Sequence, residues 1–337
     1  MDSRARGLVA VEAMIEARKI QKLGSSSLIV TLPRNWIKRN DVKQGDIVYI
    51  IDEGKSVRII PASSKPTSNS IVMDLSRLKD PRLSAMTVSC IYTLGYDEVE
   101  LLLSRDLDIL TTLSHIRSSA SRLLGLDVAG HEGSRVRLRV VIDQTRLDLK
   151  TTIKSMANTI ALAVEVLERA ARNIDPKPKI LEDASYIRNE VFKNQHLIIR
   201  LMITNGHMIS DNGEHAHGLL IGTSLLAIIG EIILDGIYKI VKNNFRVSKE
   251  TIMYIERLKK LVPIAGFTLS TPSIKRGKEI LYNIVKTREE ISQRISEEGL
   301  GRGDVILLTK IDDSLKTLQI IVYTSFCAAT SNLILSK

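Results

Sequence analysis

The stretch RKIQKLGSSSLIVTLPRNW, residues 18–36, places a short apolar run among basic side chains. The run extends from Leu28 to Leu32, and Pro33 ends it. Short runs rich in β-branched residues and bounded by glycine or proline are typical of strands. The basic residues that flank the run are Arg18, Lys19, Lys22 and Arg34. The stretch therefore predicts a strand accompanied by cations, and the rest of the chain must show what those cations bind.

Two further apolar runs, at 47–51 and 57–60, follow the first. Glycine and proline residues separate or close these runs, at Gly24, Gly45 and Pro61, as strands joined by tight turns require. Residues 17–62 are therefore predicted to form a small β-rich domain. A segment of this size buries little apolar surface alone, so we expect it to oligomerise.

The segment from Arg18 to Pro61 resembles the AbrB/SpoVT swapped-hairpin DNA-binding module. The resemblance lies in RKIQKLG, the strand SLIVTLP, the short helix PRNWIKRNDV, the turn Gly45-Asp46 and the closing VRIIP. It implies that two chains interleave their hairpins into one β-rich barrel, whose basic face binds double-stranded DNA. Trp36 is expected to pack the short helix against this barrel.

The charge distribution agrees with that implication. Seven Lys or Arg residues lie between Ala17 and Lys43, and only Glu16 and Asp41 stand near them as counter-charge. Duplicated by a two-fold axis, such a surface can displace the counterions of phosphate groups. The alternative is that these charges only keep a dimerisation module in solution.

Individual roles in DNA contact are assigned by position. Arg18, Arg34 and Lys22 are the candidates for base edges or phosphates, whereas Lys19 and Lys38 are expected to contact phosphate alone. These five residues form the predicted DNA-binding site.

A polar linker, residues 62–70, leads to a second zone at about 71–143. The pattern of this zone predicts a strand at 71–75, a helix ending at Leu94, a strand at 99–103, a helix at about 107–124 and a strand at 136–142. The pair Asp80-Pro81 supplies a cap and a first-turn proline for the first helix. The zone is therefore a small α/β segment.

The remainder of the chain has helical periodicity. Behind a cap at Asp148, apolar residues from Leu149 to Leu167 recur every three or four positions, as on the buried face of a helix. Further helices are predicted at about 181–205, 216–243, 248–262, 272–297 and 304–335, with a break from Pro263 to Pro272. Six helices indicate two three-helix bundles, at 147–244 and 245–337.

This domain order resembles the AbrB–PhoU architecture of archaeal phosphate-uptake regulators. The wording YTLGYDEVEL at 92–101 is similar to that family's transition from helix through glycine to strand. PhoU proteins are cytoplasmic regulators that act on the phosphate ABC transporter. Their bundles carry E/D-x-x-x-D motifs for iron or zinc, because clustered carboxylates suit such cations.

Here the chain departs from the pattern of that family. Phe192 stands where the family has a metal-binding Asp, and Ala227 stands where it has Glu, although Glu231 remains. In the second bundle Glu279 is retained, but Asn283 replaces the carboxylate four positions later. We therefore expect no iron or zinc cluster and no other cofactor.

Three other groups of residues are candidate sites. Glu231 and Asp235 share one helix face and could hold a cation, or could pair with Lys or Arg. The loop histidines could bind a metal with Asp211 or Glu214, or could face solvent, and they are His207, His215 and His217. The alternating arginines of one strand could bind an anion, or could form an ordinary exposed face, and they are Arg135, Arg137 and Arg139.

Composition narrows the class of protein. A net charge of +10 favours polyanionic partners. Two distant cysteines, Cys90 and Cys327, indicate neither a disulfide framework nor a zinc site. Glu231 and Asp235 interrupt the apolar stretch at 218–241 before it reaches the roughly 20 residues of a membrane span, so a buried helix is expected. No catalytic motif is present, and we expect no enzyme.

These observations predict a cytoplasmic, homodimeric transcriptional regulator of phosphate uptake. Its N-terminal domain would bind operator DNA, and its helical bundles would sense state through a protein partner such as the transporter ATPase. The alternative is an adaptor that does not bind DNA and inhibits the phosphate ABC transporter by protein contact.

Overall fold

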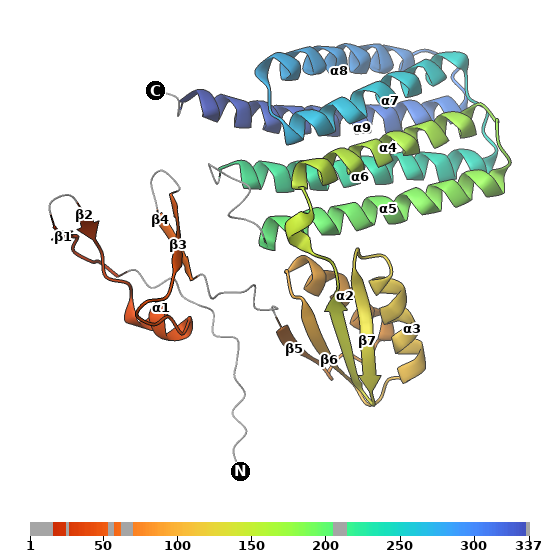
Figure 1. Cartoon of the computed structure of the whole chain (residues 1–337). Helices are drawn as coiled ribbons and strands as arrows, with labels where there is room; N and C mark the ends of the chain where they lie inside the picture. Colours follow the sequence, from red (N-terminus) through yellow and green to blue (C-terminus); the bar gives the residue numbers. More distant parts are fainter. Residues whose placement is uncertain (1–15, 25–26, 53–56, 62–69, 205–213, 335–337) are drawn as a thin grey trace. The chain divides into compact units, whose positions relative to one another are not determined.

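The computed structural model describes residues 16–24, 27–52, 57–61, 70–204 and 214–334. The chain divides into two compact units, Met1–Thr67 and Ser68–Lys337. Figure 1 shows both units and labels most of their elements, and each unit is described by itself.

The first unit consists of two antiparallel hairpins joined by a short helix (Figure 1). Its elements are β1 (Gln21–Leu23), β2 (Ser27–Ile29), α1 (Arg34–Arg39), β3 (Val48–Asp52) and β4 (Val57–Pro61). β1 pairs with β2, and β3 pairs with β4. The predicted strands at 47–51 and 57–60 are confirmed. The first apolar run is a strand only as far as Ile29, and the sequence did not predict β1.

The second unit begins with a four-stranded mixed sheet. Its elements are β5 (Ser70–Leu75), α2 (Pro81–Thr93), β6 (Glu98–Leu103), α3 (Ile109–Ala120), β7 (Leu126–Glu132) and β8 (Arg135–Val140). The strand order is β5-β6-β8-β7, with β5 parallel to β6 and the other pairs antiparallel. Helical side chains such as Val88 and Ile116 share a buried core with Leu101 and Val136 of the sheet. The helices α2 and α3 therefore cover one face of this sheet.

The sequence did not predict strand β7, and α3 is shorter than predicted. The pair Ala129-Gly130 interrupts the alternation of Leu126 and Val128, so the period-two signal ends after three positions. Gly133, with a φ of +54°, forms the turn between β7 and β8. A residue with positive φ between two short runs is typical of a hairpin.

Six helices complete the second unit. They are α4 (Leu149–Ala171), α5 (Lys177–Thr204), α6 (Glu214–Asn243), α7 (Lys249–Ser270), α8 (Ile274–Ile295) and α9 (Arg302–Ile334). α4, α5 and α6 pack on one another, and so do α7, α8 and α9. Contacts between α4 and α7 and between α6 and α9 join the two sets, which share one continuous apolar core.

The apolar helix α6 lies inside this arrangement. From Gly218 onward it is the one described helix whose length and composition would suit a membrane span. Leu226, Ile229 and Ile233 are nevertheless buried in the core, and the helix packs against α4, α5 and α9. Its apolar character is therefore accounted for by the neighbouring helices.

The predicted break at Pro263 is wrong, because α7 continues through this residue to Ser270. A proline inside a helix removes one backbone hydrogen bond and costs about 3 kcal/mol. The flanking Leu261, Val262 and Ala265 are all buried. Burial of such side chains contributes about 1.5–3 kcal/mol each for the larger ones, which offsets the cost of the proline.

Candidate nucleic-acid interface

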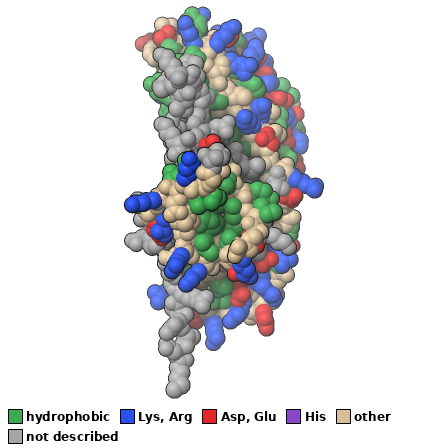
Figure 2. Space-filling model, turned by 60° about the vertical axis from the view of Figure 1, so that its left-hand side comes forward, with side chains coloured by type: hydrophobic (Ala, Val, Ile, Leu, Met, Phe, Trp, Pro, Cys, Tyr) green, Lys and Arg blue, Asp and Glu red, His purple; other side chains and the backbone are tan. Residues whose placement is uncertain are grey.

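Many of the large apolar side chains described in the first unit are exposed. Leu28 is 70% exposed and Ile50 is 67% exposed, and neither apolar core of the structure includes a described residue of this unit. Figure 2 brings the left-hand side of Figure 1 forward and shows hydrophobic side chains gathered in one area, with Lys and Arg around it. The exposed apolar set comprises Ile20, Leu23, Leu28, Ile29, Val30, Ile47, Tyr49, Ile50 and Val57.

The predicted DNA-binding residues lie on the same unit and are exposed. Arg18 and Lys19 precede β1, and Lys22 lies within it. Arg34 is the first residue of α1, and Lys38 lies in its last turn. Residues four apart on a helix share one face, so α1 holds Arg34 and Lys38 side by side.

Most of these cations are not neutralised by a nearby carboxylate. Arg18 pairs with Glu16, and Lys43 lies 3.5 Å from Asp41. Among the described residues, no ion pair holds Lys19, Lys22, Arg34 or Lys38. Exposed ammonium and guanidinium groups without a protein partner can bind phosphate oxygens, and an exposed pair such as Arg18 with Glu16 is weak enough to exchange.

The short helix α1 is fixed at both ends by backbone contacts. The carbonyl of Pro33 accepts from the N–H groups of Trp36 and Ile37. At the other end, the Asn40 amide donates to the Trp36 carbonyl at 2.8 Å, and Asp41 takes a φ of +48° to turn the chain. Trp36 is only half-buried within a single chain.

In the second unit, the acidic residues Glu231 and Asp235 both form ion pairs. Arg188 donates to Glu231 at 3.2 Å. Asp235 binds Lys239 at 3.0 Å and Lys310 at 2.7 Å. Burial raises the pKa of Asp235, but the bonds from Lys310 and Lys239 outweigh burial and lower the pKa below its usual value. Both carboxylates are therefore paired with Lys or Arg.

The positions of the two replaced carboxylates provide no metal ligand. Phe192 lies under the Arg122 guanidinium at 4.1 Å and against the His196 ring at 3.8 Å, and Ala227 is 7% exposed. Among the residues that the structure describes, no three His, Cys, Asp or Glu side chains are grouped to hold a metal ion.

The other candidate groups are placed as follows. His207 and Asp211 lie outside the described residues, as do the side chains of Glu214, His215 and His217. Two of the alternating arginines form ion pairs, Arg135 with Glu100 at 3.1 Å and Arg139 with Glu98 at 3.0 Å.

The sequence did not reveal Arg200, which is completely buried. Its guanidinium donates to the carbonyl of Tyr92 at 2.7 Å, to that of Tyr96 at 2.9 Å, and to the Asp97 carboxylate at 2.5 Å. Burial lowers the pKa of Arg200, although an arginine stays charged in proteins. Burial also raises the pKa of Tyr92 to about 12. Arg200 thus fastens α5 to the turn between α2 and β6.

Comparison with known proteins bears on the first unit. The family model described as antidote-toxin recognition MazE, bacterial antitoxin, matches residues 21–67. No curated protein is significantly similar to the chain. Residues 21–67 are therefore similar to a domain of the MazE/AbrB type.

Proposed function

We propose that this chain is a DNA-binding transcriptional regulator that works as a homodimer. The observation that carries the proposal is the first unit, where an exposed apolar set and unpaired cations coincide within a domain of the MazE/AbrB type. An isolated two-stranded hairpin is at best marginally stable in water. A second copy that interleaves its hairpins would bury the apolar set and complete a barrel.

Dimerisation would also double the basic surface. Each chain contributes Arg18, Lys19, Lys22, Arg34 and Lys38, so the pair presents ten cations related by a two-fold axis. Contacts between such cations and the DNA phosphates supply most of the affinity for DNA, and they set the register in which base edges are read. Palindromic operators match such two-fold proteins.

We further propose that the regulated process is phosphate uptake. The six helices form two sets of three, as expected for PhoU-like bundles, and residues 92–101 form the end of α2, the turn at Gly95 and the start of β6. Because the metal-binding carboxylates are replaced, the bundles would sense state through a protein partner in the cytoplasm. The transporter ATPase is the proposed partner.

The purified chain should bind a random duplex with strong dependence on salt. If about six phosphates are neutralised, affinity falls on the order of 10³-fold between about 50 and 200 mM salt. Fluorescence anisotropy of a labelled duplex measures this fall. A chain that shows no salt-sensitive duplex binding at low ionic strength would instead be the adaptor that silences the transporter by contact.

Sedimentation velocity serves as the companion measurement. The matching family is named for toxin recognition, so a protein toxin is the second candidate to cover the apolar set. A purified chain that sediments as a dimer supports pairing with a second copy. A monomer that fails to bind duplex supports a protein toxin as the partner that covers the apolar set.

Addition of the transporter ATPase should change operator affinity. A partner that binds the bundles can shift the placement of the two DNA-binding units, provided that it binds one arrangement more tightly than the other. Operator titrations with and without saturating ATPase measure the change, and an unrelated ATP-binding cassette ATPase is the control. Identical affinities in both titrations would rule out this partner.

A further inference from the structure

The sheet face turned away from α2 and α3 is exposed and charged. On β8, Val136 and Leu138 point into the core while the alternate Arg135, Arg137 and Arg139 are exposed. On β6 the same alternation turns Glu98 and Glu100 away from the core. A row of arginines therefore runs beside a row of glutamates on one face.

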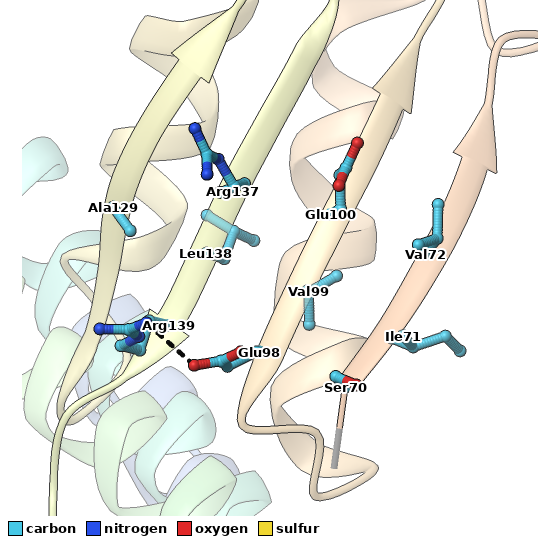
Figure 3. A pocket seen from close by; sticks show the side chains of 10 residues that line it. All are labelled: Ser70, Ile71, Val72, Glu98, Val99, Glu100, Ala129, Arg137, Leu138 and Arg139. Atoms are coloured by element: carbon cyan, nitrogen blue, oxygen red, sulfur yellow. Dashed lines mark ion pairs between the residues drawn. The ribbon is translucent and has the colours of Figure 1, made fainter. Parts of the chain in front are cut away.

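An open hollow of about 440 Å³ lies on this face. Figure 3 shows its side chains, which come from all four strands. Apolar surface is supplied by Val72 of β5 and Ala129 of β7, and polar groups by Arg137 and the Arg139–Glu98 pair. Sites for small ligands commonly have this size and this mixture of apolar walls and a few polar groups.

Two ion pairs on this face hold the glutamates of β6. Glu98 binds Arg139, and Glu100 binds Arg135. The strand register places Arg137 directly opposite Glu100, yet the carboxylate bonds diagonally to Arg135. Among the described residues, no hydrogen bond or ion pair holds the Arg137 guanidinium.

A β-bulge leaves no polar side chain directly opposite Arg137 on β7. Val128 pairs with Leu138 and Gly130 pairs with Arg137, so Ala129 is the additional residue. Neither Ala129 nor Gly130 has a polar side chain that could reach the guanidinium. Bulges are frequent beside binding sites, where they redirect side chains.

The geometry points to a binding site for a small organic oxyanion in this hollow. Arg137 binds the two oxygens of a phosphate or carboxylate with its planar fork, and the apolar body of the ligand lies over the neighbouring Ala129. The other charged groups of the lining are Glu98, Arg139 and Glu100. Glu98 pairs with Arg139, and Glu100 pairs with Arg135, which lies outside the lining. With these two carboxylates beside it, the hollow suits a ligand with a single anionic group better than a polyanion. This inference does not depend on DNA binding.

Calorimetric titration of the full chain with phenyl phosphate, benzoate and phenol tests the site. Both anions should bind in the millimolar range or tighter, and neutral phenol at least about tenfold more weakly. Arg137→Gln should weaken the binding of both anions at least about tenfold, to the affinity of phenol. Arg117→Gln is the matched control, because it removes an exposed arginine from α3 on the other side of the sheet, and it should leave the affinity unchanged.

A second variant keeps the arginine and supplies it with a partner. Ala129 is exposed, so Ala129→Glu can place a carboxylate beside Arg137 without disturbing the core, and it should also abolish anion binding. The inference is overturned if wild type prefers neither anion to phenol, or if Arg137→Gln binds them unchanged. It is also overturned if Arg137→Gln dissociates the dimer or weakens duplex binding, because a second copy or DNA is then the occupant.

Discussion

Replacing Arg18, Lys22 and Arg34 together with alanine is expected to weaken duplex binding by more than about 100-fold and to flatten its salt dependence. The three side chains are exposed, so their removal changes charge with little loss of packing. In a dimer six cations disappear, and the log–log salt slope falls by about 0.9 for each phosphate that is no longer neutralised. Anisotropy titrations across a salt series give both quantities.

A control with the same change in charge distinguishes the site from general electrostatics. Arg117, Lys275 and Lys278 are exposed residues of the second unit, and their joint replacement with alanine also removes three positive charges per chain. This control should bind duplex within a few-fold of wild type. Equal losses of duplex affinity in both triple variants would show that DNA binding depends on the net charge of the chain and not on the surface of the first unit.

Arg200→Met is expected to be the most destabilising single substitution, at about 3 kcal/mol or more. The methionine fills much of the volume but leaves the Tyr96 carbonyl without the Arg200 donor, and the Tyr92 carbonyl with the Gly95 N–H alone. Asp97 loses the charge that faces it, although Gln144 still donates to it at 3.1 Å. Removing one partner of a buried network leaves desolvated groups unpaired, which costs more than the network stabilises.

Arg188→Met on the same helix is the matched control for Arg200→Met. Arg188 also pairs with a carboxylate and lies 5.0 Å from a tyrosine ring centroid, but both charged side chains are partly exposed. Water replaces such a pair, and the expected cost is at most about 1 kcal/mol. Midpoints of urea unfolding compare the two variants. Similar midpoints would mean that the Arg200 contacts do not hold the sheet segment to α5.

Local signals predicted most helices correctly because they act within one turn. Asp80, Asp108 and Asp148 each accept a backbone N–H two or three residues later, and such caps are visible as single letters before an apolar pattern. Pro263 shows the limit of this reasoning. Its local cost is real, but the burial of its neighbours depends on α4 and α9, which no local window includes.

The same contrast between local sequence signals and contacts distant in the chain applies to the candidate sites. The basic residues of the first unit could be identified from the sequence, since a run of Lys and Arg without acidic neighbours is a local pattern. Arg200 looks like any helical arginine, because its partners lie more than 100 positions away in the chain. Arg137 was predicted only as one of three equivalent arginines, and the register and the bulge are what set it apart.

The exposed apolar set has a consequence for how the proposed DNA-binding species depends on the abundance of the chain. If the first unit completes its barrel only with a second copy, mass action sets the amount of the DNA-binding species. While monomers predominate, that amount rises with the square of the chain concentration, so halving the chain removes about three quarters of it. Synthesis and degradation of the protein would then tune operator occupancy before any signal reaches the helices.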